Sequence, residues 1–135
     1  MHVAFFKYQY GNLADKIAAR WTRGPYSHCE LLFSDGKSFT CQIKHNKTAY
    51  IDFKHGPQWD LVEVDVKEHN VRAFCDDQLQ FKYDYLALVG FTLYNNLRLD
   101  SRWVCSNLCA SALVAGGLRI PTHVHPNELH RELTK

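Results

Sequence analysis

The sequence lacks the features that mark several classes of protein. Its apolar runs are short, as in Val3-Ala4-Phe5-Phe6, and none is long enough to span a bilayer. The net charge is only +2, which is too small to argue for nucleic acid or an anionic membrane surface as a partner. The first residues show neither a basic region nor a small-residue cleavage site, so we expect no secretion signal and a cytoplasmic or phage-associated protein.

Repeats, low-complexity segments and linkers are also missing, so residues 1–135 are expected to form a single domain. Apolar residues make up 46% and charged residues 22% of the chain, which is typical of a globular protein with a real core. The five cysteines are odd in number and follow no disulfide framework. This pattern predicts a reducing compartment and mostly free thiols, most of them buried as small apolar side chains.

The hydrophobic periodicity predicts strands first and helices afterwards. Strands are expected over 2–7 (buried on both sides), 27–33, 38–43, 48–53 and 59–66, with a hairpin turn at Asp35-Gly36 and the appearance of an antiparallel meander. Helices are expected over 13–21 (capped by Asn12), around 71–79, over 85–94 and over 104–115, the last ended by Gly116-Gly117, with a final turn at 126–129. The fold class is therefore α+β, an antiparallel sheet of about five strands packed against helices.

Cys105 lies where a reactive cysteine is expected. The segment from Arg102 to Ala110 is predicted to open a helix, with the thiol in its first turn. Unpaired backbone N–H groups and the positive end of the helix dipole favour the nucleophilic thiolate there, and the same N–H groups can stabilise an oxyanion. Cys109, one turn further along the same face, is the better candidate for the core. A purely buried thiol is the alternative interpretation of Cys105.

A cysteine nucleophile needs a histidine within hydrogen-bond reach, and the chain has eight. His28 differs from the others because it lies in an aromatic and apolar strand, whereas His45, His55 and His69 lie in turns or among charges. A histidine in such a strand must be satisfied by a partner if it is buried, so a structural role is the alternative.

Four segments resemble motifs of the circularly permuted NlpC/P60 (papain-like) cysteine hydrolases, the group with YiiX-like and lecithin:retinol acyltransferase-like enzymes. Ser27-His28-Cys29-Glu30-Leu31 is similar to their histidine strand, and Val104-Cys105-Ser106-Asn107-Leu108 to their Cys-Ser-Glu-Leu helix start. Phe81-Lys82-Tyr83-Asp84-Tyr85 resembles their Pro-Tyr-Asp segment, and Pro126-Asn127-Glu128-Leu129 a closing Pro-x-Asp-Leu segment. The order is the permuted one. Over residues 2 to 130, the resemblance implies a permuted papain-like fold in which Cys105 and His28 are the catalytic pair.

The resemblance also implies a polar residue that orients the imidazole of His28, about a dozen residues further along. This position lies near Thr40, with Gln42 on the same strand face and with the longer reach. Glu30, two residues from His28, is a further candidate. The candidates for the substrate pocket or the oxyanion site are Tyr83, Glu30 and Ser106.

The sequence therefore predicts a thiol hydrolase of amide bonds that needs no cofactor and acts on a peptide, a peptidoglycan peptide or an acyl substrate. A thioesterase, a lipid acyltransferase or a deubiquitinase-like isopeptidase would use the same site. Asn107 replaces the acidic residue usual in the family, which also permits a non-catalytic binding or virion module. The competing hypothesis is zinc held by Cys105 and Cys109 or by Cys41 and His45, although structural zinc sites prefer Cys-x2-Cys knuckles.

Overall fold

The computed structural model describes residues 1–42, 47–80 and 101–135, so the helix expected over 85–94 lies outside the described residues. Each strand and helix that was expected in the described ranges is present, with shifted ends. In chain order the elements are β1 (His2–Lys7), η1 (Tyr8–Tyr10), α1 (Leu13–Thr22), β2 (Tyr26–Leu32), β3 (Lys37–Gln42), β4 (Lys47–Asp52), β5 (Trp59–Glu63), α2 (Glu68–Gln80), α4 (Ser101–Ala115) and α5 (Pro126–Leu133).

The five described strands form one antiparallel sheet in the order β4-β3-β2-β1-β5. The expected meander is therefore wrong at its last step, because β5 pairs with β1 instead of β4. Val3 on β1 lies opposite Leu31 on one side and Val62 on the other. Strands that follow one another in the sequence often pair in the sheet, but they do not always do so. The place of β1 between β2 and β5 pairs both of its edges and buries Val3, Ala4 and Phe5.

The helix ends show which local signals hold. Asn12 caps α1 as predicted, since its Oδ1 accepts from the backbone N–H of Asp15 at 3.0 Å. Gly116 and Gly117 follow the end of α4, and Gly117 has a φ of 109°. The start of α4 differs from the prediction because the helix begins at Ser101. Cys105 is thus its fifth residue, beyond the first turn, where unpaired N–H groups and the dipole act most strongly.

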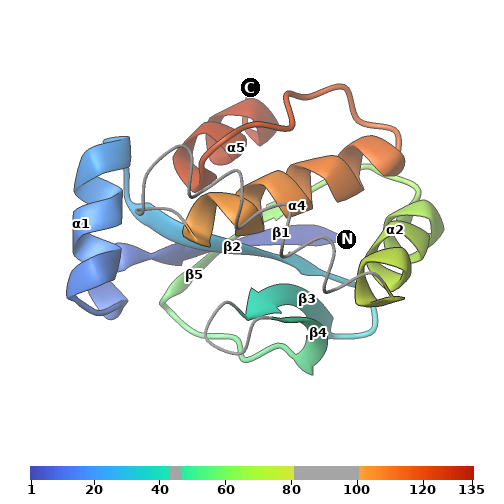
Figure 1. Cartoon of the computed structure of the whole chain (residues 1–135), viewed down its shortest axis with the longest axis horizontal. Helices are drawn as coiled ribbons and strands as arrows, with labels where there is room; N and C mark the ends of the chain where they lie inside the picture. Colours follow the sequence, from blue (N-terminus) through green and yellow to red (C-terminus); the bar gives the residue numbers. More distant parts are fainter. Residues whose placement is uncertain (43–46, 81–100) are drawn as a thin grey trace.

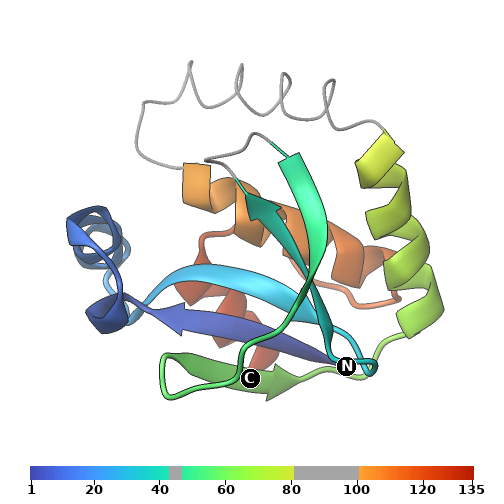
Figure 2. The same cartoon turned by 90° about the horizontal axis from the view of Figure 1, so that it is seen from below.

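The helices gather on one face of the sheet, which makes the protein an α+β fold as expected. Figure 1 shows α4 lying across the sheet with α5 and α2 on either side of it. The core between these layers contains Phe5, Leu31, Phe39, Leu108 and Leu113, all buried. Helix α1 stands apart from the other helices at one end of the sheet (Figure 2). The finer expectation of a permuted papain-like fold stays a prediction.

Asn127 joins three elements at the start of β2. Its Oδ1 accepts from the backbone N–H of Tyr26 at 2.9 Å, and its Nδ2 donates to the Tyr26 carbonyl at 2.9 Å and to Thr22 Oγ1 at 2.7 Å. A Cβ atom at Gly24 would collide with the Asn127 side chain, which explains the glycine there. This buried amide fixes where β2 begins, two residues before His28.

Candidate functional site

His28 is held by a buried carboxylate on its own strand. Its Nε2 lies 3.2 Å from Glu30 Oε1 and 3.5 Å from Thr40 Oγ1. The other oxygen of Glu30 accepts from the Ser38 hydroxyl at 2.8 Å. Burial raises the pKa of Glu30, but the hydrogen bonds from His28, Ser38 and Thr40 and the charge of His28 lower it further, so its pKa lies below the usual value. The result is an ionised acid that orients an imidazole.

Two aromatic side chains lie beside this polar cluster, in register with His28. Phe6 pairs with His28 on one side and with Trp59 on the other, so the three form a row across β2, β1 and β5. The ring centroids of Phe6 and Trp59 are 5.1 Å apart, and those of His28 and Trp59 are 6.3 Å apart. His28 is therefore partly shielded from solvent on its β5 side, while its ring keeps an accessible portion.

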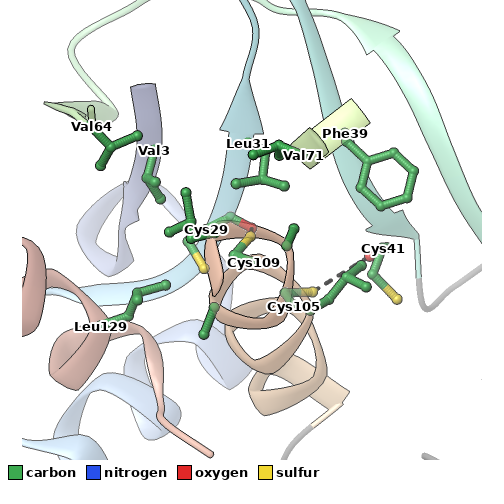
Figure 3. Packing of buried hydrophobic residues seen from close by; sticks show 14 of the residues in the cluster. Val3, Cys29, Leu31, Phe39, Cys41, Val64, Val71, Cys105, Cys109 and Leu129 are labelled. Carbon is green, nitrogen blue, oxygen red and sulfur yellow. Dashed lines mark hydrogen bonds between the residues drawn. The ribbon is translucent and has the colours of Figure 1, made fainter. Parts of the chain in front are cut away.

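Cys105 lies against strand β3, where it meets a second thiol. Its Sγ donates to the backbone carbonyl of Cys41 at 3.6 Å (Figure 3). The interaction with the Cys41 side chain, followed by burial, raises the pKa of Cys105 well above its usual value. The same interaction lowers the pKa of Cys41, although burial acts in the opposite direction. In this arrangement Cys105 is a neutral thiol with 1% of its surface exposed.

The remaining cysteines belong to the core, as their sequence environment predicted. All five are free and buried. Cys109 Sγ donates to the Cys29 carbonyl at 3.9 Å, one helical turn from the Cys105–Cys41 contact. Burial raises the pKa of Cys75 and of Cys29, and a hydrogen bond with Cys29 followed by burial raises that of Cys109. These three side chains behave as packing residues.

The structure brings the predicted residues together in two groups. His28, Glu30 and Thr40 form one, and Cys105 with Cys41 forms the other. Within residues 1–42, 47–80 and 101–135, the hydrogen-bond partners of His28 are Glu30 and Thr40, with no bond to Cys105. Strand alternation explains the separation: Cys29 packs in the core against α4, so the side chain of its neighbour His28 projects from the other face of β2.

The other predicted site residues are placed as follows. Ser106 is fully buried, and its hydroxyl donates to the Val124 carbonyl at 2.5 Å. Asn107 accepts from the Val124 N–H at 2.9 Å, so both residues hold the segment before α5 against α4. Tyr83 and the side chain of Gln42 lie outside the described residues.

Sequence reasoning missed the role of Cys41, although a signal was present. The Asp35-Gly36 turn fixes the pairing of β2 and β3, with Leu31 opposite Phe39. Continuing that register by two residues places Cys29 opposite Cys41, on the face that carries the core. Two cysteines symmetric about a hairpin turn could therefore have been predicted to face one helix together.

A second polar cluster lies on the helix side of the sheet. The Tyr26 hydroxyl donates to Asp60 Oδ2 at 2.8 Å, and Lys7 Nζ lies 2.8 Å from Asp60 Oδ1. His130 Nε2 lies 3.4 Å from the same hydroxyl, and its ring packs on Tyr26. Burial and the contact with Asp60 raise the pKa of Tyr26, so the hydroxyl stays protonated and acts as a structural donor.

Comparison with known proteins leaves the family resemblance as a prediction. No protein-family model matches the chain, and no curated protein or solved structure matches it either. Among the residues that the structure describes, no group of three or more His, Cys, Asp or Glu side chains is arranged to hold a metal ion. The same residues include no helix with the length and apolarity needed to cross a membrane.

Proposed function

We propose that this protein is a cysteine hydrolase of amide bonds, with Cys105 as nucleophile, His28 as general base and Glu30 as the residue that positions His28. The observation that carries the proposal is the His28–Glu30 pair, at 3.2 Å, with Ser38 bound to the far oxygen of the carboxylate. A buried acid that fixes the ring and stabilises its protonated form is the support that a catalytic imidazole needs. Helix α4, which carries Cys105, packs on the same strands, β2 and β3, from the face opposite to His28.

The proposed reaction requires a rearrangement that brings Cys105 and His28 together, because Cys105 lies on the helix side of β2 whereas His28 projects from the other face. The thiol of Cys105 must leave Cys41 and pass its proton to His28 while Sγ attacks the carbonyl carbon of the substrate. His28 then gives the proton to the departing amine, and water hydrolyses the thioester that remains. The contact with Cys41 keeps Cys105 protonated in the arrangement described, so the enzyme must also sample, without substrate, a form in which Cys105 has left Cys41.

The substrate class follows from the resemblance, which favours a peptide bond, including those of peptidoglycan stem peptides. The same pair of residues could cleave an ester or a thioester. The substrate that the protein accepts therefore distinguishes a peptidase-like from an acyltransferase-like enzyme. Comparing hydrolysis of muropeptides with that of p-nitrophenyl acyl esters by the purified full chain separates these two outcomes.

The test uses matched pairs of variants. Cys105→Ala should abolish hydrolysis and Cys109→Ala should retain it, because Cys109 packs against Cys29. His28→Ala should lower kcat about 10²–10⁴-fold, whereas replacing His69, which is exposed, should not. Glu30→Gln should shift the pH–rate profile, since an amide cannot stabilise protonated His28. Activity that survives in Cys105→Ala refutes the assignment, provided that circular dichroism shows the variant folded.

A specific observation favours a second candidate, a non-catalytic binding module. Cys105 is buried, its pKa is raised and its partner is Cys41 rather than His28. Alkylation with iodoacetamide, located by peptide mass spectrometry at pH 6, 7 and 8, decides between the two. The enzyme requires selective modification of Cys105 at pH 6 to 7. A module retains the arrangement described, so Cys41, whose pKa is lowered, should react first and Cys105 slowly.

A further inference from the structure

The exposed apolar side chains concentrate at one end of the molecule. Six large apolar residues are exposed in the described part of the chain, and four of them lie within residues 8–17. Leu13 and Ile17, one turn apart on α1, expose 73% and 51% of their surfaces, and Tyr8 and Tyr10 on η1 are exposed as well. Single exposed apolar residues are ordinary, whereas a cluster of this kind marks an interaction surface.

Three cations lie beside this cluster. Lys16, Arg20 and Arg23 line a shallow cleft of about 610 Å³ between α1, η1 and the start of β2. Tyr8 and Pro25 form its other walls. None of the three cations makes an ion pair with another residue in the described ranges. A cleft with three free positive charges and no carboxylate in its lining is suited to an anion.

Arg23 occupies a backbone position that favours glycine. It ends α1 with a φ of 52°, in the left-handed region. The glycine of this turn, Gly24, comes one residue later, so Arg23 itself adopts the left-handed backbone. A non-glycine residue there is uncommon and is strained relative to glycine. The side chain that bears this strain lines the cation cleft. Such an outlier is a reason to look for a function in the side chain.

The apolar and cationic residues share one side of α1. Leu13, Lys16, Ile17 and Arg20 follow one another at spacings of three, one and three residues, so they form a continuous exposed strip. The apolar pair occupies one edge of the strip and the cations the other, next to the cleft. Figure 2 shows α1 standing off at the end of the sheet, where this strip can meet a flat surface.

We propose that η1 and α1 form a docking surface for a bilayer that contains anionic phospholipids. Leu13 and Ile17 enter the boundary between headgroups and acyl chains, and the two tyrosines lie at the level of the headgroups. Lys16, Arg20 and Arg23 bind lipid phosphates in the cleft. The charge complementarity is local and is hidden in the small net charge of the whole chain. This inference is independent of the proposed hydrolase.

Co-sedimentation of the full chain with vesicles tests the proposal. Vesicles of phosphatidylcholine with 30 mol% phosphatidylserine should bind the protein, and vesicles of phosphatidylcholine alone should bind it weakly. Each of Lys16→Gln, Arg20→Gln and Arg23→Gln should reduce partitioning about fivefold, and the triple variant roughly a hundredfold. Leu13→Ser with Ile17→Ser should reduce it on both kinds of vesicle. Binding should also weaken between low and high salt.

Matched controls separate the surface from general effects of charge and apolarity. Lys54→Gln, Lys67→Gln and Arg119→Gln remove three exposed charges elsewhere, and Leu61→Ser with Val114→Ser remove two exposed apolar residues elsewhere. These controls should keep full binding. Equal losses in the controls, or no binding to the anionic vesicles, overturn the proposal.

Two further measurements exclude the other occupants. NMR titration with inorganic phosphate that saturates the cleft, combined with no vesicle binding, would assign the cleft to a soluble anion and overturn membrane docking. Sedimentation velocity that shows a dimer, dissociated by Leu13→Ser, would assign the strip to a second copy of this chain and would overturn it equally. A monomer that binds anionic vesicles supports the docking surface.

Discussion

Replacing Asn127 tests whether a single buried amide determines where the histidine strand begins. Asn127→Ala removes the side-chain partner of the Tyr26 N–H and of the Tyr26 carbonyl, and it removes one partner of Thr22 Oγ1, which also donates to the Ala19 carbonyl. Tyr26 and Thr22 are both buried, with 7% and 8% of their surfaces exposed. Water therefore cannot replace the lost partner without opening the junction between α1, β2 and α5.

The expected loss follows from the two backbone groups of Tyr26. A buried donor or acceptor left without a partner costs about 1–3 kcal/mol, so the pair should cost about 3 kcal/mol. For a chain of this size we expect a fall of roughly 10 °C in Tm. Urea unfolding followed by circular dichroism and by tryptophan fluorescence measures the free energy of unfolding and shows whether the transition remains two-state.

Asn107→Ala is the matched control, because it makes the same substitution at an asparagine with one hydrogen bond to a backbone N–H, that of Val124. It should cost about 1 kcal/mol. If Asn127→Ala is no more destabilising than Asn107→Ala, the number of buried groups that Asn127 satisfies does not determine the stability of the junction, and the reasoning fails.

Three further predictions concern stability. Cys109→Ala should lower the free energy of unfolding by about 1 kcal/mol in urea, because the buried thiol leaves a small cavity; no change would mean that Cys109 is not a packing residue. The pKa of Glu30 is held low in the folded state, so its ionised form stabilises the fold at neutral pH, and this contribution is lost as the pH falls through the folded-state value. Glu30→Gln should lack that loss in acid unfolding, and an unchanged acid profile contradicts the assignment. Arg23→Gly should raise the free energy of unfolding by about 0.5–1 kcal/mol by relieving the positive φ, and a decrease would show that the side chain stabilises the fold.

Local signals predicted most of the fold. The signals for the strand over 27–33, the turn at Asp35-Gly36 and the cap at Asn12 act over a few residues, and the structure confirms each of these features, although β2 is buried along almost its whole length rather than alternately. The partner of β5 was not predictable in the same way, because its choice between β4 and β1 depends on how the whole sheet buries β1. The start of α4 was also missed, since the expected helix opened at Val104 whereas α4 already includes Ser101, Arg102 and Trp103.

The candidate site was predicted as residues but not as contacts. Strand alternation links His28 with Glu30, so that contact could be derived from the sequence, whereas Thr40 was expected from the family resemblance. The pairing of Cys105 with Cys41 depends on how α4 is placed on β3, which no local pattern encodes. The predicted pairing of Cys105 with His28 rests on the family resemblance, and the alkylation experiment tests it.

The place of β1 between β2 and β5 affects how the chain folds during synthesis. β1 is made before β5, so one of its edges finds its partner only after residues 59–63 have left the ribosome. Until then β1 and β2 can form a hairpin whose outer edge is apolar and unpaired, a template for pairing with other nascent chains. The β1–β5 contact also spans a long stretch of sequence, which slows folding. Aggregation during expression should therefore be most sensitive to changes in β5, the strand that closes this edge.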